Sequence, residues 1–295
     1  MSASVQIPAP ASIPRDARGP RVRSRAARVV VYVVLVVLGA AMFLPLFWLV
    51  VTSVLPSSQA FELPPTWIPT EIRPDNYART FDLVPFGVQI WNSILVTVVA
   101  VIGQLATSAL AAYAFARLQF KGREVIFVLF LAAMMIPAQV TVIPIFIMMR
   151  NLGLVDNLAS LWLPALLSVF AIFFLRQHFL SIPAELEEAA KIDGAGPWRI
   201  LFGMFLPLSG PILTAVGIFG ALAVWNDFFW PNIMITSPEN MTIPVGLVYL
   251  QAGLGGAPAA VVFAAISVVM LPLLLLYLLA QDRITEGVAL AGISR

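Results

Sequence analysis

The chain has 295 residues, of which 60% are hydrophobic and only 11% are charged, and its mean hydropathy is +0.95. Charged residues make up about a quarter of an ordinary soluble domain, so this composition excludes a typical soluble globular protein. The formal net charge is +2, and the absence of cysteine excludes disulfides, thiolate metal ligands and thiol chemistry.

Residues 1–28 are rich in Ala, Pro, Ser and Arg without an apolar period, which predicts a disordered, basic cytoplasmic tail. The tail does not resemble a cleaved signal peptide, because the uncharged run after it is too long and lacks a small-residue cleavage site. Its arginines precede a membrane span directly. Membrane topology and anionic lipid therefore explain them better than nucleic-acid binding does.

Six long runs without a charged residue follow, and each is about long enough to cross roughly 30 Å of hydrocarbon as a helix. We therefore predict an all-α, polytopic membrane protein with six transmembrane helices, near 29–51, 94–115, 125–148, 158–174, 200–224 and 261–279. Prolines in these runs predict kinked helices, since neighbouring helices can satisfy the freed carbonyls. They are Pro45, Pro137, Pro144, Pro164 and Pro272.

Two segments between the spans are predicted to lie outside the membrane. Residues 55–86, the first outer segment, are rich in proline and polar turn residues and read as an extended surface segment. Residues 237–258, the second outer segment, are apolar enough to dip partly into the membrane. The predicted organisation is a tail (1–28), a first helix with its outer segment (29–87), a transmembrane core (88–281) and a cytoplasmic C-terminal tail (282–295).

The basic residues are distributed unevenly across this topology. With the N-terminus inside, 14 of the 17 lysines and arginines fall on the cytoplasmic side, and only Arg73, Arg79 and Arg150 fall outside. This is the pattern expected from the positive-inside rule. It predicts that both termini are cytoplasmic.

The predicted span interiors contain no ionisable residue, which argues against a proton-coupled carrier but leaves open a sodium-coupled one that uses broken helices. The only two lysines, Lys121 and Lys191, do not follow a glycine as the lysine of a phosphate-binding loop does. If transport is active, its energy must come from another chain.

The loop 183–199 begins with a compact group of charges, "ELEEAAKIDGA". Ser181 or Ile182 is predicted to cap a short helix with Pro183 in its first turn. Early glutamates suit the helix dipole, and Glu187 and Lys191 are an i,i+4 pair. Gly194 stands where a positive φ closes a helix. A solvated connector would explain the charges equally simply.

The fuller spacing, from Glu188-Ala189-Ala190 through Gly194 to Met204-x-Leu206-Pro207, resembles the signature loop of binding-protein-dependent ABC importer permeases. Met204 stands where that family often has isoleucine. The stretches "PDNYART", "MMIPAQVTVIPIF", "LGLVDN" and "AVWNDFFWPNIMI" resemble the carbohydrate branch, on the maltose-type inner permease pattern. The ending "QDRITEGVALAGISR" resembles the family's C-terminus at Gln281, Arg283, Gly287 and Gly292 but lacks its aromatic residues.

The resemblance implies a type I ABC importer permease in a bacterial inner or plasma membrane. It implies as partners a second homologous permease, two ATP-binding subunits and an extracytoplasmic solute-binding protein, and it gives the second outer segment a contact with that protein. The loop helix would dock on the ATPase and, held to spans 4 and 5, act as a lever. It implies no catalytic residue, cofactor or metal ligand. The coupling residues would be Glu188, Ala189, Ala190, Asp193 and Gly194.

Candidate substrate-pathway residues lie at the outer end of span 5. They are Trp225, Asn226, Asp227 and Phe228, and the simpler interpretation of such a group is an interfacial aromatic belt. The transported solute is expected to be a carbohydrate. A non-sugar solute such as a glycerol-phosphate ester, or an ion-coupled secondary carrier, is the alternative.

Overall fold

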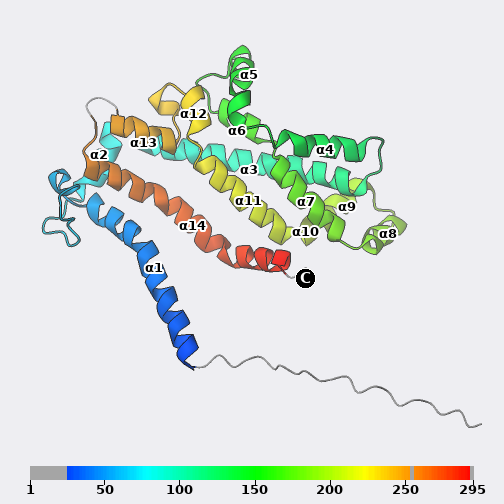
Figure 1. Cartoon of the computed structure of the whole chain (residues 1–295). Helices are drawn as coiled ribbons and strands as arrows, with labels where there is room; N and C mark the ends of the chain where they lie inside the picture. The colour runs from blue at the N-terminus through cyan, green and yellow to red at the C-terminus, as the bar shows by residue number, and fades with distance from the viewer. Residues whose placement is uncertain (1–24, 253–255, 293–295) are drawn as a thin grey trace, which may run out of the picture. The chain divides into compact units, whose positions relative to one another are not determined.

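The computed structural model describes residues 25–252 and 256–292, and every regular element in this part of the chain is helical (Figure 1). The chain divides into two units, 1–48 and 49–295, which are described separately. Of the predicted N-terminal tail, only residues 25–28 lie within the described part, and they form the first turn of α1 (Arg25–Ser53). Up to Trp48 this helix is apolar and largely exposed, as a helix in lipid would be.

The second unit contains all the remaining helices. On the outer side of the predicted topology lie η1 (Ser57–Gln59), α2 (Asp75–Leu83), α12 (Phe229–Met234), η3 (Pro238–Asn240) and α13 (Ile243–Ala252). The other elements are α3 (Phe86–Arg117), α4 (Arg123–Ala133), α5 (Ala138–Asn151), α6 (Ala159–Ala165), α7 (Val169–Ser181), α8 (Ala184–Ile192), α9 (Pro197–Ile200), η2 (Leu201–Phe205), α10 (Leu206–Leu208), α11 (Gly210–Trp225) and α14 (Ala259–Gly292).

Four described helices are long and apolar enough to cross a membrane, or up to six if each of two bent pairs forms one span. The bent pairs are α4 with α5, at 99°, and the helices from Pro197 to Leu208 with α11, at 79°. These are spans 3 and 5 of the sequence prediction. For span 3, where Pro137 and Pro144 predicted only a kink, the prediction was wrong; no bend was predicted for span 5. Pro137 precedes α5, and Pro207 and Pro211 flank the break at Ser209; proline removes a donor and disfavours helix in the residue before it.

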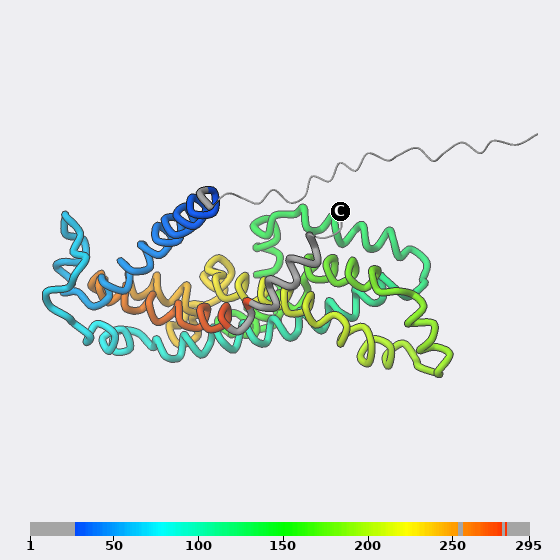
Figure 2. The backbone as a smooth tube through the Cα atoms, turned by 90° about the horizontal axis from the view of Figure 1, so that it is seen from below, coloured from blue at the N-terminus to red at the C-terminus, as the bar shows by residue number. Residues whose placement is uncertain are grey.

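Helix α3 is the centre of the second unit. It packs against α6, α7, α11 and α13. At its C-terminal end, Tyr113 and Ala116 join Phe179 from α7 and Phe205 from η2 in one buried apolar cluster. The views in Figures 1 and 2 agree that α8 and α2 lie at opposite ends of this unit, which is the separation that the predicted topology requires.

Candidate functional site

The charged stretch after span 4 forms the short helix α8, as predicted, but it begins one residue later than expected. Pro183 is its N-cap, with φ −55° and ψ 136°, rather than a residue of its first turn. The Ser181 hydroxyl donates to the His178 carbonyl at 2.7 Å, so it closes α7 and does not cap α8. The predicted cap at Ser181 or Ile182 is therefore wrong, because the serine side chain bonds backwards to its own helix.

Gly194 closes α8 with a φ of +78°, which confirms the predicted conformation. The Gly194 N–H donates to the Lys191 carbonyl at 3.0 Å, and the Ala195 N–H donates to the Ala190 carbonyl at 2.9 Å. These two bonds are a Schellman motif, which satisfies carbonyls that the helix leaves unpaired. The turn directs the chain back toward the buried cluster, against which both alanines pack.

One face of α8 is buried, and its contacts extend beyond the spans that the sequence suggested. Glu187 is 6% exposed and pairs with Lys191 at 2.8 Å, as predicted, but also with Arg117 at 3.6 Å, the last residue of α3. Ala190 is turned toward the same face and packs on the buried cluster. The helix is thus held by α3 as well as by the elements on either side of it.

The opposite face of α8 is open to solvent and chemically mixed. Glu185, Glu188 and Ala189 are exposed, and Ile192 is 86% exposed. Within the described residues Glu188 makes no ion pair, whereas the neighbouring Glu187 makes two. We call Glu185, Glu188, Ala189 and Ile192 the outward face. Of the predicted coupling residues, Glu188 and Ala189 lie on this face, Asp193 and Gly194 are exposed at its end, and Ala190 does not belong to it.

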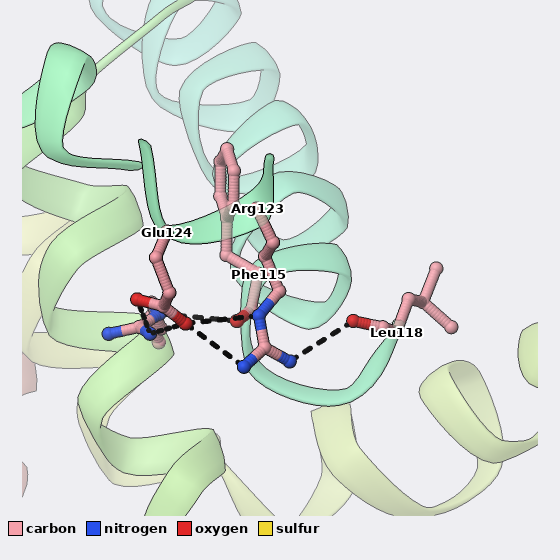
Figure 3. A network of polar contacts seen from close by, with 5 residues as sticks. Phe115, Leu118, Arg123 and Glu124 are labelled. Atoms are coloured by element: carbon pink, nitrogen blue, oxygen red, sulfur yellow. Dashed lines mark hydrogen bonds and ion pairs between the residues drawn. The ribbon is translucent and has the colours of Figure 1, made fainter. Parts of the chain in front are cut away.

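A second arginine, Arg176, joins α7 to the beginning of α4 at the same end of the molecule. Figure 3 shows how Phe115, Arg123 and Glu124 lie there. Arg176 donates to both carboxylate oxygens of Glu124, at 3.2 and 3.1 Å, and to the Phe115 carbonyl at 3.2 Å. Its guanidinium lies 4.0 Å from the centroid of the Phe127 ring. Because the side chain is only 11% exposed, these contacts compensate a charge that would be costly to bury alone.

The candidate substrate-pathway residues do not converge on one point. Trp225 is buried and lines an apolar cleft of about 480 Å³ between α3, α11 and α14. Asn226 donates to the Leu222 carbonyl at 2.8 Å, and Asp227 accepts from the Trp230 N–H at 3.3 Å, so both bond to nearby backbone. Phe228 is 40% exposed. Of the four residues, only Trp225 lines this cleft.

Possible metal ligands do not gather in the part of the chain that the structure describes. Within it, no group of three or more His, Asp or Glu side chains lies close enough to hold a metal ion. The cleft beside Trp225 is lined by aliphatic side chains with Thr97 and Thr214 as its polar members, and it contains no charged side chain.

On the outer side, Asp156 links the loop between α5 and α6 to the second outer segment. Its carboxylate accepts from the backbone N–H groups of Thr236 and Ser237, each at 3.0 Å, and from the Ser237 hydroxyl. Its carbonyl accepts from Asn240 at 2.7 Å, and its φ is +59°. Partial burial alone would raise the pKa of Asp156, but the hydrogen bonds from Ser237, Thr236 and Asn240 outweigh burial and lower the pKa to about 2.

We expect Asp156→Asn to loosen this link and to lower the stability of the purified protein at neutral pH by on the order of 1 kcal/mol, after allowing for solvent screening. A lowered folded-state pKa gives stability that is present above about pH 4 and is lost as the pH falls toward about 2. The difference in melting temperature between wild type and variant should therefore shrink over that window. Asp82→Asn, the same change at an exposed residue of α2, is the control. An unchanged melting temperature for Asp156→Asn at pH 7 would contradict the assignment.

Comparison with known proteins gives a consistent result. Residues 104–289 match a family described as the binding-protein-dependent transport system inner membrane component. The chain is 33% identical to the arabinooligosaccharides transport system permease protein AraQ of Halalkalibacterium halodurans, over 84% of this chain and 90% of that protein. It is 32% identical to the diacetylchitobiose uptake system permease protein NgcG of Streptomyces coelicolor, over 88% of this chain and 86% of that protein.

Two further similarities extend the comparison. The chain is 32% identical to the sn-glycerol-3-phosphate transport system permease protein UgpE of Yersinia pestis, over 86% of this chain and 93% of that protein. Its fold is similar to a chain in the crystal structure of a bacterial ABC transporter involved in the import of the acidic polysaccharide alginate. That match has a TM-score of 0.77 and 27% identity, and it covers 88% of this chain and 98% of that chain.

Proposed function

Since the chain belongs to the family of inner membrane components of binding-protein-dependent transport systems, we propose that it is the permease subunit of an ATP-driven importer for a carbohydrate. It is a multi-pass membrane transporter subunit and not an enzyme. The observation that carries the proposal is α8, a short helix whose inner face is buried against α3 and whose outward face is free to receive a partner.

The partners follow from this role. A second homologous permease completes the translocation pathway, two ATP-binding subunits receive the 183–199 loops, and a solute-binding protein delivers the solute from outside. Both termini lie in the cytoplasm, and the core from 88 to 281 forms half of the pathway. The positions of α8 and of the second outer segment at opposite ends of α3 support this arrangement.

The carbohydrate assignment rests on the relatives, and the chemistry of the cleft shows what this chain alone can contribute to it. Two relatives are named for oligosaccharides. The cleft beside Trp225 has almost no polar lining, so by itself it offers a sugar few of the polar groups that orient a ligand. We infer that the second permease supplies much of the polar contact with the solute, and that Trp225 borders the pathway on this side.

A glycerol-phosphate ester is the second candidate solute, because UgpE is as similar to this chain as the oligosaccharide permeases are. A phosphate ester requires cationic or N–H donors. The residues that line the cleft include no lysine or arginine, which favours a neutral solute. Uptake of radiolabelled oligosaccharide, measured with glycerol phosphate as competitor, distinguishes the carbohydrate from the glycerol-phosphate ester as the transported solute.

Because the natural chain has no cysteine, single cysteines test the topology directly. We expect Glu188→Cys to react with a membrane-impermeant maleimide only in inverted vesicles, and Glu62→Cys in the first outer segment to react in intact cells. An ATPase should copurify with the chain, and the complex should take up solute only with ATP and binding protein. Labelling of residue 188 in intact cells, or ion-driven uptake by the chain alone as in a secondary carrier, would overturn the proposal.

A further inference from the structure

We propose that Arg117 is a positioning residue that joins α8 to α3, so that displacement of α8 is transmitted along α3 to the second outer segment. The inference rests on the proposed function, in which the outward face of α8 docks on an ATPase. It concerns how that docking is communicated across the membrane. The sequence-based lever assigned this task to spans 4 and 5, whereas the contacts assign part of it to α3.

At the inner end, one buried side chain contacts three elements. The Arg117 guanidinium donates to the Phe179 carbonyl at 2.6 Å and to the Ile182 carbonyl, at the end of α7 and in the turn before α8. It pairs with Glu187 of α8 and lies 5.0 Å from the centroid of the Phe205 ring in η2. The side chain is 11% exposed and that of Glu187 is 8% exposed.

Burial makes the loss of this pair costly for Arg117, although Glu187 keeps its second pair with Lys191. Removing one partner of a buried ion pair leaves the other charge uncompensated, which is far more costly than losing an exposed pair. If α8 moved away from α3, Glu187 would keep Lys191, but the largely buried Arg117 would lose the carboxylate of Glu187. The two helices are therefore expected to move together.

Helix α3 is suited to carry such a displacement. Its 32 residues form one unbroken helix of about 48 Å, enough to span the hydrocarbon and both interfaces. Among the four described spanning helices it alone has no internal proline, while Pro45, Pro164 and Pro272 lie inside the others. A helix without a proline kink transmits motion at one end to the other end.

At the outer end, three polar side chains of α3 hold the second outer segment. Asn92 donates to the Glu239 carbonyl at 2.8 Å and to the Met241 carbonyl at 3.1 Å. Gln89, fully buried, donates to the Pro238 carbonyl at 3.2 Å, and Ser93 accepts from the Ile243 N–H at 2.8 Å. The helix whose Arg117 pairs with α8 therefore also fixes the backbone of residues 238–243.

The test uses the complete transporter in proteoliposomes, with its ATPase and solute-binding protein, and compares basal ATP hydrolysis with hydrolysis stimulated by the loaded binding protein. For Arg117→Gln we expect basal hydrolysis within about twofold of wild type but stimulation and uptake reduced by about tenfold, a typical size for coupling between distant sites. Arg117→Lys, which keeps the charge, should restore part of the stimulation. Asn92→Leu, at the other end of α3, should reproduce the loss.

Arg123→Gln is the matched control, because Arg123 lies near the same end of α3 but its ion pair is with the exposed Glu124 and its other bond is to the nearby Leu118 carbonyl. Unchanged stimulation in Arg117→Gln would overturn the inference, as would equal loss of basal and stimulated hydrolysis in all variants. If the Arg117→Gln variant does not assemble into the transporter, the stimulated hydrolysis of the Asn92→Leu variant supports or overturns the inference in its place. Failure of the proposed function would be distinguishable from failure of this inference, because the wild-type chain would then bind no ATPase at all.

Discussion

Replacing Gly194 with valine should reduce ATP-driven uptake by about 5- to 30-fold while the chain still inserts at normal levels. A left-handed backbone costs a residue with a Cβ roughly 1–2 kcal/mol, and a β-branched side chain is among the least tolerant. At the observed φ of +78° the strain would be relieved by opening the two hydrogen bonds that close α8. The outward face would then no longer be held in one orientation.

Gly196→Val is the matched control, two residues further along the same turn. Gly196 has an ordinary extended backbone, with φ −75° and ψ 168°, and an added Cβ meets nothing within 4 Å at either glycine. The pair therefore differs in backbone conformation and not in crowding. Gly194→Asp should act in the same direction but more weakly, because aspartate tolerates this conformation better than valine does. Equal uptake by the Gly194→Val and Gly196→Val variants would contradict the assigned role.

Local signals in the sequence predicted the helical elements well. Uncharged runs located the membrane helices, and the family resemblance that the motifs carried is confirmed by the match over residues 104–289. Gly194 and the Glu187–Lys191 pair were predicted because both depend on neighbours within one turn. The break before α5 was not predicted, because a proline marks a weak point in a helix but surrounding helices decide whether it kinks or separates.

Contacts between distant parts of the chain could not be predicted in the same way. In the sequence, Arg117 looks like one more basic residue at the cytoplasmic end of a span. Two of its partners, Phe179 and Glu187, lie 62 and 70 positions further along the chain. In the sequence, Asp156 looks like an ordinary loop residue, and only the fold shows that Ser237 lies beside it. Ile192 looks like part of a helix core, and only the structure shows that it is 86% exposed. A single sequence has no pattern that encodes such pairings.

Reversing the charge of Glu188 should have the largest effect on assembly. Glu188 lies on the outward face without an ion pair among the described residues, so we expect it to meet a basic group on the ATPase. A lysine there would place like charges together at an interface, which costs several kcal/mol. We expect Glu188→Lys to reduce copurification of the ATPase by about tenfold or more and to abolish uptake, with Glu188→Gln intermediate.

Three further measurements separate a docking contact from a general change in charge or folding. Glu62→Lys makes the same change of charge at an exposed residue of the first outer segment and should leave the ATPase bound. The difference in ATPase copurification between wild type and Glu188→Lys should become smaller as salt is raised. Salt screens exposed charges, with a screening length of about 10 Å at 0.1 M ionic strength. Since Glu187 and not Glu188 holds α8 to α3, the variant should keep the wild-type melting temperature. Normal ATPase binding by Glu188→Lys at low salt would show that the outward face docks without this carboxylate, and Ile192 would then be the next residue to replace.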